Sequence, residues 1–545
     1  MVDLKKIFNK ISLYYHTIKY LKASQLFFRV YFKFRRFPKT KENLEFEISK
    51  VKTGFVRTPE MEKTYLGDDI FKFLNLEGEI GNWNDQKKSK LWLYNLHYFD
   101  FLNNHSDITE CNRIIKKWIK DNPIGYGNGW EPYPLSLRIV NLVKYYISNP
   151  SKNTNELHSL YLQSVILSRS IEYHILGNHL LANAKALIFS GLFFKGAEPK
   201  RWLKKGLDIL QVEIPEQILN DGAHFELSPM YHNIILSDFL DIYNLLKCYD
   251  ESLPLYLTDA INQMLSWSDS MTHPDGDIAF FNDAAFKIAA KPNQLFEYAN
   301  RLGCVDNNYL KCLKTKSGHT FFKDSGYFIF QNQDMKSLLD LARVGPDYLP
   351  GHAHADTLSF ETSFFGQRVF VNSGTSVYGE GRERLRQRST SAHNTVDVDS
   401  FNSSEVWGGF RVAKRAIPSI PDIAVGNNSI SVKCSHNGYH RLSGKVTHVR
   451  TWSFSSSEIK IFDYLKGDFS SARVNFILHP SIRIEKLNSQ KYLLKLQNNK
   501  CVYFSSNSNL FLEDYTWHPE FGKSIKTKKI VIAMISKKTE TIINF

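Results

Sequence analysis

One change of hydrophobic periodicity constrains this chain more than any other feature of its sequence. Between about residues 90 and 310, apolar residues recur at intervals of three and four, in segments such as CNRIIKKWIKDN, SLRIVNLVKYYISN and HNIILSDFLDIYNLLKCY. This spacing is typical of amphipathic helices. Seven or more such segments, separated by short breaks, predict antiparallel helical hairpins arranged as a bundle, a solenoid or a closed ring.

After about residue 320 the period of the apolar residues changes to two. Segments such as LSFETSFFGQRVFVNSG, VTHVRTWSFSSSEIKIFDYLKG and KKIVIAMISKK are rich in Val, Ile, Phe and Thr and are bounded by Gly, Asn and Ser, as expected of strands. A series of such segments without a convincing helix predicts a β-sandwich or a stack of sheets. A helical domain followed by a β domain leaves a cleft between them, and such clefts are favoured ligand sites.

The charge of the chain narrows the possible partners. At 545 residues the chain is too long for one hydrophobic core, and its formal charge of +14 suits an acidic glycan, an anionic membrane or a nucleic acid. Residues 1 to 39 hold ten Lys or Arg and one acid, Asp3. Nucleic-acid binding is the weakest of these interpretations, because the basic excess lies mainly in that segment and no nucleic-acid-binding motif accompanies it.

The same basic segment has apolar residues at mixed helical spacing, which predicts an amphipathic helix or a pair of helices. Such an arm either contacts a membrane surface or packs on the main body. No run reaches the roughly 18 apolar residues of a membrane span, and no clean signal peptide begins the chain. We therefore expect a cytoplasmic protein with peripheral membrane contact through the arm. Six scattered cysteines argue against a disulfide framework.

Two stretches of the helical half hold polar residues that an amphipathic helix does not need. GNHLLANAKAL begins with Asn178 and His179, and Asn178 could simply be the N-cap of the helix that follows. DGAHFELSPMYH brings Glu226 and Tyr231 to the start of another helix. A tyrosine at that position is either a packing residue or a proton-transfer group.

In the β half, GHAHAD places His352, His354 and Asp356 at alternate positions, where the geometry of a strand would point all three side chains to one face. Asn372 follows in VNSGT and His393 in HNTVDVD. Imidazoles from separated strands can converge on one cation, since neutral imidazole is a common zinc ligand. The segment therefore predicts a metal site, a proton-transfer site or a solvated polar edge.

Taken together, these motifs resemble one family. GNHLLAN, DGAHFELSPMYH, GHAHADTLSFE, VNSGT and HNTVDVD occur in the order found in the heparinase II/III family of polysaccharide lyases, and the resemblance spans roughly residues 90 to 540. It implies an α+β multidomain protein: a basic helical arm and linker at 1–85, an incomplete (α/α) toroid at 86–314 and an antiparallel β-sandwich at 315–545. It also implies cleavage of a uronic-acid-containing polysaccharide by β-elimination in the cleft.

This chemistry explains why such residues are needed. The proton at C5 of a uronate is barely acidic until the adjacent carboxylate is neutralised, so one group must hold that carboxylate while another acts as base. The resemblance assigns the first task to Asn178, with His179 beside it. It assigns proton transfer to Tyr231 and, across the cleft, to His352. All must reach one sugar ring, so we expect Asn178, Tyr231 and His352 within about 10 Å of one another.

The resemblance also implies a metal site. It makes His354 and His393 the ligands of zinc or another divalent cation. The family usually has an aspartate as third ligand where this chain has Asn372, and the loss of an anionic ligand weakens divalent binding. We therefore expect the pocket to form with or without the metal.

Substrate contacts are expected from Glu226, from Trp130 and Glu131 in GNGWEP, and from the arginines of RERLRQRST. Those arginines are Arg382, Arg384, Arg386 and Arg388, and they would suit a polyanionic chain. The alternatives are a helix cap for the first segment and a solvated basic loop for the second. An additional active-site tyrosine of the family has no obvious match here; Tyr378 lies further upstream of HNT than expected.

Two classes of function follow from the sequence. The first is a polysaccharide lyase linked to surface polysaccharide metabolism. The second is a non-catalytic glycan-binding or assembly protein in surface polysaccharide biosynthesis, which the lack of a recognisable export signal favours. The presence of Asn178, Tyr231 and His352 together favours the enzyme.

Overall fold

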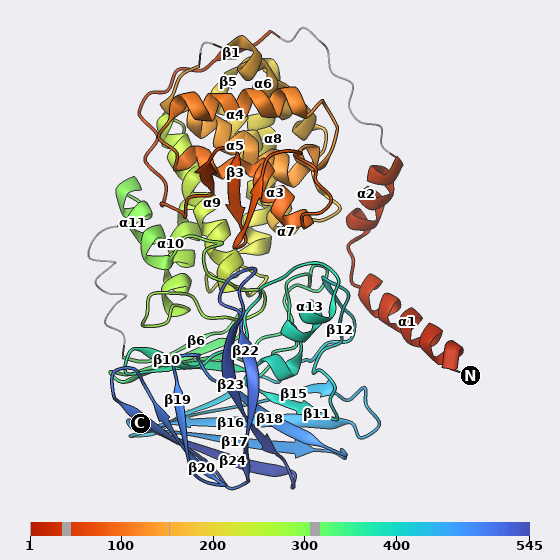
Figure 1. The fold of residues 1–545 in the computed structure, drawn as a ribbon, viewed down its shortest axis with the longest axis vertical. Coiled ribbons are helices and arrows are strands. Elements are labelled where there is room, and N and C mark those ends of the chain that lie inside the picture. The colour runs from red at the N-terminus through yellow and green to blue at the C-terminus, as the bar shows by residue number, and fades with distance from the viewer. Residues whose placement is uncertain (1, 35–44, 152, 306–316) are drawn as a thin grey trace.

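The computed structural model describes residues 2–34, 45–151, 153–305 and 317–545, with the side chains from residue 6 onward. Helices form the upper part of the molecule and antiparallel sheets form the lower part (Figure 1). The predicted order, helices followed by strands, is confirmed. The predicted boundary between residues 314 and 315, and Cys312 with it, lies outside the described residues.

The helical part contains nine α-helices within the described residues of 90–302, and all seven segments that the periodicity predicted are among them. They are α3 (Lys90–Tyr98), α4 (Ile108–Asp121), α5 (Pro132–Ser148), α6 (Thr154–Ser168), α7 (Gly177–Phe193), α8 (Ala197–Gln217), α9 (Pro229–Cys248), α10 (Leu255–Ser270) and α11 (Pro292–Leu302). Two 3-10 turns, η1 (Asp100–Asn103) and η2 (Asn128–Trp130), complete the helical connections.

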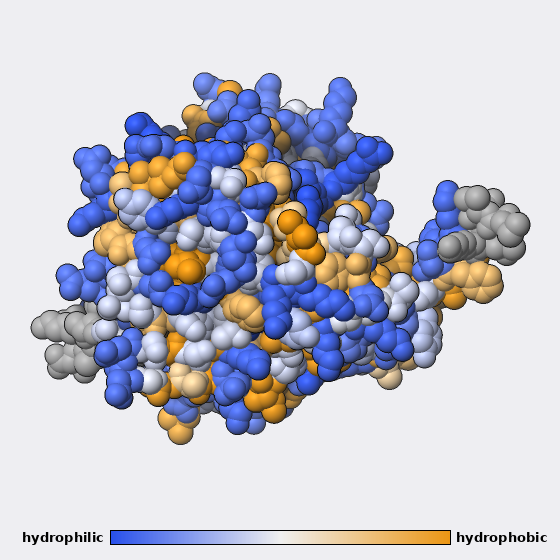
Figure 2. Space-filling view, turned by 90° about the horizontal axis from the view of Figure 1, so that it is seen from below, coloured by the Kyte–Doolittle hydropathy of each residue, from blue (hydrophilic) through white to orange (hydrophobic). Residues whose placement is uncertain are grey.

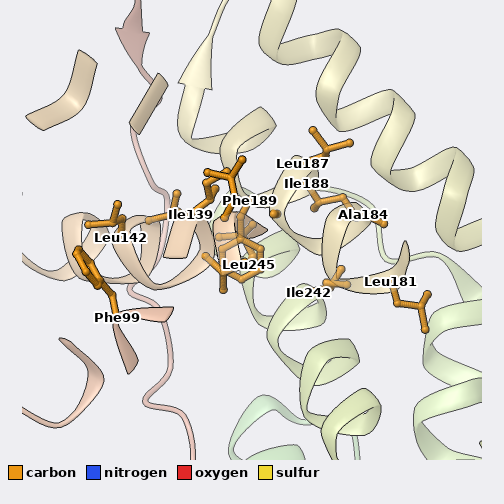
Figure 3. Packing of buried hydrophobic residues seen from close by; sticks show 14 of the residues in the cluster. Phe99, Ile139, Leu142, Leu181, Ala184, Leu187, Ile188, Phe189, Ile242 and Leu245 are labelled. Carbon is orange, nitrogen blue, oxygen red and sulfur yellow. The ribbon is translucent and has the colours of Figure 1, made fainter. Parts of the chain in front are cut away.

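Helix α7 is the central element of the helical core. It is buried along almost its whole length and packs against α5, α8 and α9. Figure 3 shows side chains of α5, α7 and α9, among them Ile139, Phe189 and Leu245, meeting in this core. Helices α7 and α8 approach closely because Gly206 has no side chain: a Cβ there would lie 2.8 Å from the carbonyl oxygen of Ala184. This packing holds the first turn of α7 in place.

The β part is built from three larger antiparallel sheets, as predicted (Figure 1). The five-stranded sheet has the order β10 (Gln367–Phe370), β9 (Phe360–Phe364), β8 (Met335–Asp340), β7 (Tyr327–Gln331), β6 (Gly318–Phe322). The four-stranded sheet has the order β11 (Val396–Val398), β18 (Ala472–Ile477), β23 (Ile525–Ala533), β22 (Leu510–Trp517). The eight-stranded sheet has the order β14 (Asp422–Val425), β15 (Ile430–Tyr439), β16 (Val446–Phe454), β17 (Glu458–Lys466), β24 (Lys538–Asn544), β21 (Cys501–Ser506), β20 (Lys491–Lys495), β19 (Arg483–Asn488).

Smaller elements depart from the sequence-based expectation. The segment predicted as a linker contains a three-stranded sheet, β2 (Tyr65–Gly67), β3 (Ile70–Phe73) and β4 (Leu76–Glu79), because Phe71 and Phe73 on β3 pack into the helical core. Nearby, β1 (Glu47–Ile48) pairs with β5 (Phe194–Lys195). The β part also holds a short hairpin, β12 (Val406–Trp407) with β13 (Arg411–Val412), and two helical turns that were not expected, α13 (Arg382–Gln387) and η3 (Thr390–Ala392).

The N-terminal arm forms the expected pair of helices, α1 (Val2–Ile18) and α2 (Ala23–Phe34), at the side of the molecule (Figure 1). It is attached to the body by specific contacts. The indole nitrogen of Trp407 donates to Thr17 Oγ1 at 3.1 Å, and Lys22 pairs with Glu216 at 2.7 Å. None of the described helices is long and apolar enough to cross a membrane.

Candidate active site

A cavity of about 1430 Å³ lies between the helical part and the β part. Helices α3, α5, α7 and α9 contribute its upper wall, and loop segments at 348–352, 376–380, 409–411 and 520–524 contribute the lower wall. Tyr14, Thr17 and Ile18 of the arm also line it. Four of the residues expected to act in chemistry, Asn178, His179, Tyr231 and His352, line this one cavity.

The centre of the site is a stack of two rings from different parts of the chain. The ring of Tyr231, in the first turn of α9, lies 3.8 Å from the imidazole of His352 at an angle of 17°. Ser228 caps α9, accepting from the backbone N–H of Tyr231 at 3.2 Å, and donates to the carbonyl of Asp283 at 2.5 Å. The tyrosine is thereby held at a helix start that is tied to the loop between α10 and α11.

A second tyrosine completes this pair. The hydroxyls of Tyr231 and Tyr378 are 2.9 Å apart, and both residues line the cavity. Burial raises the pKa of both phenols well above 10, and a negative charge on Tyr378 would raise the pKa of Tyr231 further. Both tyrosines are therefore protonated at neutral pH and can donate a hydrogen bond or a proton.

His352 is oriented by Glu226. The Nδ1 atom of His352 is hydrogen-bonded to Glu226 Oε2, and the carboxylate is buried. Burial alone would raise the pKa of Glu226, but the charge and hydrogen bond of His352 outweigh it and lower that pKa. An ionised carboxylate at Nδ1 requires a proton on that nitrogen, so the Nε2 atom of a neutral His352 carries a free lone pair.

The first turn of α7 supplies the opposite side of the site. The helix begins after Leu176, with no side-chain cap, so Asn178 is not the N-cap. Burial raises the pKa of the neighbouring Tyr133, and the side-chain amide of Asn178 opposes that rise. His179 stacks on Tyr133 at 4.3 Å, and its Nδ1 atom lies 3.1 Å from the buried carboxylate of Glu172. Asn178 and His179 thus place polar groups on the same cavity as Tyr231.

Behind the cavity lies a second cluster that water does not reach. His354 Nδ1 lies 3.0 Å from His393 Nε2, and ligand atoms of these two residues and of Asp356 lie within 4.8 Å of one another. His354 Nε2 faces Asp283 at 2.9 Å, and His393 Nδ1 faces the carbonyl of Ser389 at 2.7 Å. Both partners only accept, so both of those nitrogens carry the protons.

These two protons determine the state of the nitrogens that face each other, His354 Nδ1 and His393 Nε2. Burial lowers the pKa of His354, and it lowers that of His393 to about 4. Two neutral imidazoles with these tautomers would oppose lone pair to lone pair, so the gap needs a shared proton or a cation. Two imidazole nitrogens and a carboxylate are a suitable donor set for zinc or a similar divalent ion. The residues therefore fit a divalent cation.

Asp283, in the loop between α10 and α11, joins this cluster to residues of the β part. Its carboxylate accepts from Arg384 Nη2 at 2.7 Å and from Thr375 Oγ1 at 3.2 Å, in addition to His354. Burial opposes ionisation, but the charge of Arg384 and the hydrogen bonds lower the pKa of Asp283 far below its usual value. The backbone N–H of Asp283 donates to the carbonyl of His352 at 3.0 Å. The buried charges therefore brace the loop that carries His352.

Several expectations from the sequence need correction. GHAHAD is not a strand but a loop, so His352 faces the cavity while His354 and Asp356 face the buried cluster. Asn372 is not positioned as a ligand, because its amide donates to Phe280 O at 2.9 Å and accepts from Asn394 N at 3.1 Å. The carboxylate of Asp356 lies close to the two imidazoles instead.

The expected substrate contacts are also corrected in part. Trp130 packs in the helical core against Trp118, and neither it nor Glu131 is part of the cavity lining. Glu131 instead pairs with Lys90 at 2.9 Å. Arg388 is buried and donates to the carbonyl of Ala353 at 2.8 Å, so it supports the loop between the two histidines. None of the four arginines Arg382, Arg384, Arg386 and Arg388 lines the cavity.

Some residues of the site had no clear signal in the sequence. Tyr378 lies too far from HNTVDVD in the sequence to match the family's tyrosine, and no motif marks Asp283, Tyr133 or Glu172. Asp283 follows Asn282 in FFND, a short polar break in an apolar stretch. That break was the one available signal.

Fold and cavity together define a class: a protein with a helical toroid over an antiparallel β domain and a tyrosine–histidine pair between them. The model of the heparinase II/III N-terminus matches residues 3–302, and that of the heparinase II/III-like C-terminal domain matches residues 314–545. The chain belongs to the heparinase II/III family.

Similarity to known proteins supports this family assignment. The chain is 33% identical over 247 residues to a heparin-sulfate lyase of Bacteroides stercoris, covering 42% of this chain and 37% of that protein. It is 27% identical over 322 residues to a heparin-sulfate lyase of Pedobacter heparinus, covering 52% and 47%. The chain thus spans less than half the length of these curated relatives. A crystal structure of heparinase III superimposes with a TM-score of 0.71 at 20% identity, covering 85% of this chain and 79% of that one, which shows the shared fold.

Proposed function

We propose that this protein is a polysaccharide lyase that cleaves a uronic-acid-containing acidic polysaccharide by β-elimination. The observation that carries the proposal is the stack of Tyr231 on His352 in the cavity, with Asn178 lining the same cavity from α7. A phenol and an imidazole at one point can remove one proton and return another. The names of the curated relatives, heparin-sulfate lyases, support the same class of reaction.

In the first step His352 acts as the base. Glu226 fixes the proton on Nδ1, which leaves the Nε2 lone pair to take the proton from C5 of the uronate. The electron pair of the C5–H bond moves into a C4–C5 double bond as the bond from C4 to the leaving glycosidic oxygen breaks. A general base that is oriented by a buried carboxylate is a common arrangement in enzymes.

In the second step Tyr231 acts as the acid. Its raised pKa makes it a poor base at neutral pH but keeps the phenol protonated, so it can give its proton to the leaving oxygen. Tyr378, whose hydroxyl lies 2.9 Å away, can accept from or donate to Tyr231 while the charge develops. The products are a new reducing end and a chain that ends in an unsaturated uronate.

The carboxylate of the uronate must be neutralised before C5 loses its proton. Asn178 supplies an amide donor on the cavity wall, and His179, held at Nδ1 by Glu172, can present its other ring nitrogen. Stabilising the carboxylate in the form that it takes in the transition state is the larger part of the catalytic task.

We also propose that His354, His393 and Asp356 hold a divalent cation behind the cavity. When bound, such an ion would supply fixed positive charge between the two facing imidazole nitrogens. The loop that carries His352 would then be tied to a rigid cluster, while the reacting groups remain those of the cavity.

The arm is the basis of a proposal about location. Eleven of its described residues are large hydrophobic residues with exposed side chains, among them Phe8 at 68% and Phe27 at 65%. Lys6, Lys10 and Lys33 accompany them, and the arm projects from the body in Figure 2. An exposed apolar helix face with lysines suits an anionic lipid surface. Sedimentation with anionic vesicles, but not with neutral ones, and its loss on deletion of residues 2–34, would test this.

The lyase proposal is tested by the product. Purified protein is incubated with a panel of acidic glycans, including the surface polysaccharide of its own source, and the ultraviolet absorbance of an unsaturated uronate is followed. Absorbance that grows with time and with enzyme concentration is the expected result. If binding occurs without any product from this panel, the protein is a glycan-binding or assembly protein of surface polysaccharide biosynthesis instead.

A further inference from the structure

The charge of the cavity differs from the charge of the chain. The whole sequence carries +14, yet the residues that line the cavity include nine Lys or Arg and eight Asp or Glu. The difference, nine minus eight, leaves a formal excess of one positive charge. A cleft built for a densely charged polyanion would concentrate unpaired cations along its walls.

Two lysines of the upper wall are neutralised within the wall itself. Lys185 lies 2.6 Å from Asp238 and 2.5 Å from Asp241, and Lys144 lies 2.5 Å from Asp241. Asp100 also lines the cavity and accepts from the amide of Asn141 at 2.7 Å. The two ammonium groups already have their partners, and an incoming anion would have to displace carboxylates that are held in place.

The lysines of the lower wall are paired as well. Lys287 lies 2.6 Å from Glu62 and 3.4 Å from Glu520, and Lys523 lies 3.1 Å from Glu520. On the upper wall, Lys90 lies 2.9 Å from Glu131, which is outside the lining. The carboxylate oxygens of Glu62 and Glu520, which accept hydrogen bonds, line the cavity in which a sugar chain would lie.

Few cations of the lining remain for a substrate. Arg411 is weakly paired with Glu380 at 4.0 Å. Only Arg29, Lys63 and Lys72 have no carboxylate within 4.0 Å among the described residues. Arg29 and Arg411 both line the cavity, and burial together with the charge of Arg411 lowers the pKa of Arg29. Each guanidinium group can hold a carboxylate.

We infer that the substrate is an unsulfated uronic-acid polysaccharide, with about one negative charge per repeating unit and hydroxyl or N-acetyl groups elsewhere. The inference rests on the proposed lyase function and names the substrate class for the same cavity. The paired wall carboxylates accept hydrogen bonds from sugar hydroxyls, and the few free cations suffice for isolated carboxylates.

A sulfated chain would meet a different environment. Each sulfate group stays ionised at every working pH, and its entry into a partly buried cleft requires a cation to offset the lost hydration. Next to Asp238, Asp241 or Glu520 it would instead meet a carboxylate. Repulsion of this kind is one way in which a site discriminates against a competitor.

The test compares glycans that differ only in sulfation. The full chain is assayed on heparosan against heparin, and on unsulfated chondroitin against chondroitin sulfate, by the appearance of the unsaturated uronate. We expect kcat/KM to be at least about tenfold higher for the unsulfated member of a cleaved pair. Equal or higher values for the sulfated member would overturn the inference but leave the lyase function standing.

If none of the four glycans yields product, the lyase proposal loses its support from this panel, and calorimetric binding of the same four glycans decides the inference separately. Tighter binding of the unsulfated member at physiological salt supports it. Tighter or equal binding of the sulfated member overturns it. The two proposals therefore fail by different observations.

A pair of matched variants shows whether the wall pairs are the cause. Glu62→Gln removes the carboxylate that lies 2.6 Å from Lys287 in the cavity. Glu485→Gln removes one that lies 2.6 Å from Lys495 on β19 and β20, outside the cavity lining. Both glutamates are exposed, and each variant removes one negative charge. The first should raise the sulfated-to-unsulfated ratio of kcat/KM, or of binding, by about two- to fivefold, and the second should leave it unchanged. Equal effects would overturn the inference.

Discussion

The cavity site and the cluster behind it use the same residue types in opposite ways. His352 has one carboxylate partner and an open side toward the cavity, with 15% of its side chain exposed. His354, two residues later, is 1% exposed and is enclosed by His393, Asp283 and Asp356. One imidazole is left free to exchange a proton, and the other is fully engaged. The difference teaches that the surroundings of a histidine, rather than its motif, decide whether it is a reactive group or part of the scaffold.

The largest expected effect belongs to the cavity side. Tyr231→Phe keeps the ring stacked on His352 but removes the group that returns the proton, so the elimination rate should fall by about 10² to 10⁴-fold. Steady-state kinetics on a cleaved glycan, with thermal unfolding as a control for folding, measures this. A variant that keeps more than about a tenth of the wild-type kcat would exclude Tyr231 as the acid.

The buried side should respond in stability instead. Asp283→Asn leaves Arg384 buried without its counter-ion, so the free energy of unfolding should fall by about 3–5 kcal/mol, measured by denaturant titration. Glu485→Gln, which breaks an exposed pair with Lys495, is the control and should cost about 1 kcal/mol or less. Similar losses in the two variants would mean that the cluster is not a structural brace.

Glu226 shares a feature with each of the two regions, because its carboxylate is buried like the cluster but contacts the reactive imidazole of His352. Glu226→Gln replaces the ionised acceptor that fixes the tautomer of His352 by a neutral amide that can also donate, and kcat should fall about 10- to 100-fold while KM changes little. The matched variant is Glu172→Gln, which acts on His179 in the same way and should mainly raise KM if His179 helps to hold the carboxylate. A reversed pattern would exchange the roles of the two histidines.

The smallest effect is expected from metal removal. Because a shared proton can replace a cation between His354 and His393, treatment with a chelator should lower the Tm by no more than about 3 °C relative to protein with added zinc. Asp356→Asn should abolish this difference. Stoichiometric zinc that resists chelation, or unfolding on its removal, would show that the ion is an obligatory part of the fold.

Much of the architecture was predictable from local patterns. The helices around Ile139, Leu181 and Ile242 and the strands of the β part follow directly from apolar spacing, because each element must bury one face. The sheet around Phe71 was not predicted. Its strands are only three or four residues long, and they are stabilised by packing on α3 rather than by their own pattern.

The site was predictable only in part. Asn178, His179, Tyr231 and His352 were found because motifs in a fixed order mark them, and they do line one cavity. Trp130 was misjudged because an aromatic residue beside a glycine and a glutamate has the same local sequence whether it faces a sugar or a core. Tyr378 was passed over because its distance along the chain from HNTVDVD carries no information about its distance in space.

The sequence by itself determined the order of helical and β parts, the chemical groups available and the family to which they belong, because these depend on periodicity and on short motifs. The tertiary structure decided which of those groups share an environment. Period two predicted that His352, His354 and Asp356 face the same way, but the loop held by Arg388 and Asp283 turns the first into the cavity and the others into the interior. Side-chain direction in a loop is set by contacts with residues distant in the chain, and no local pattern contains them.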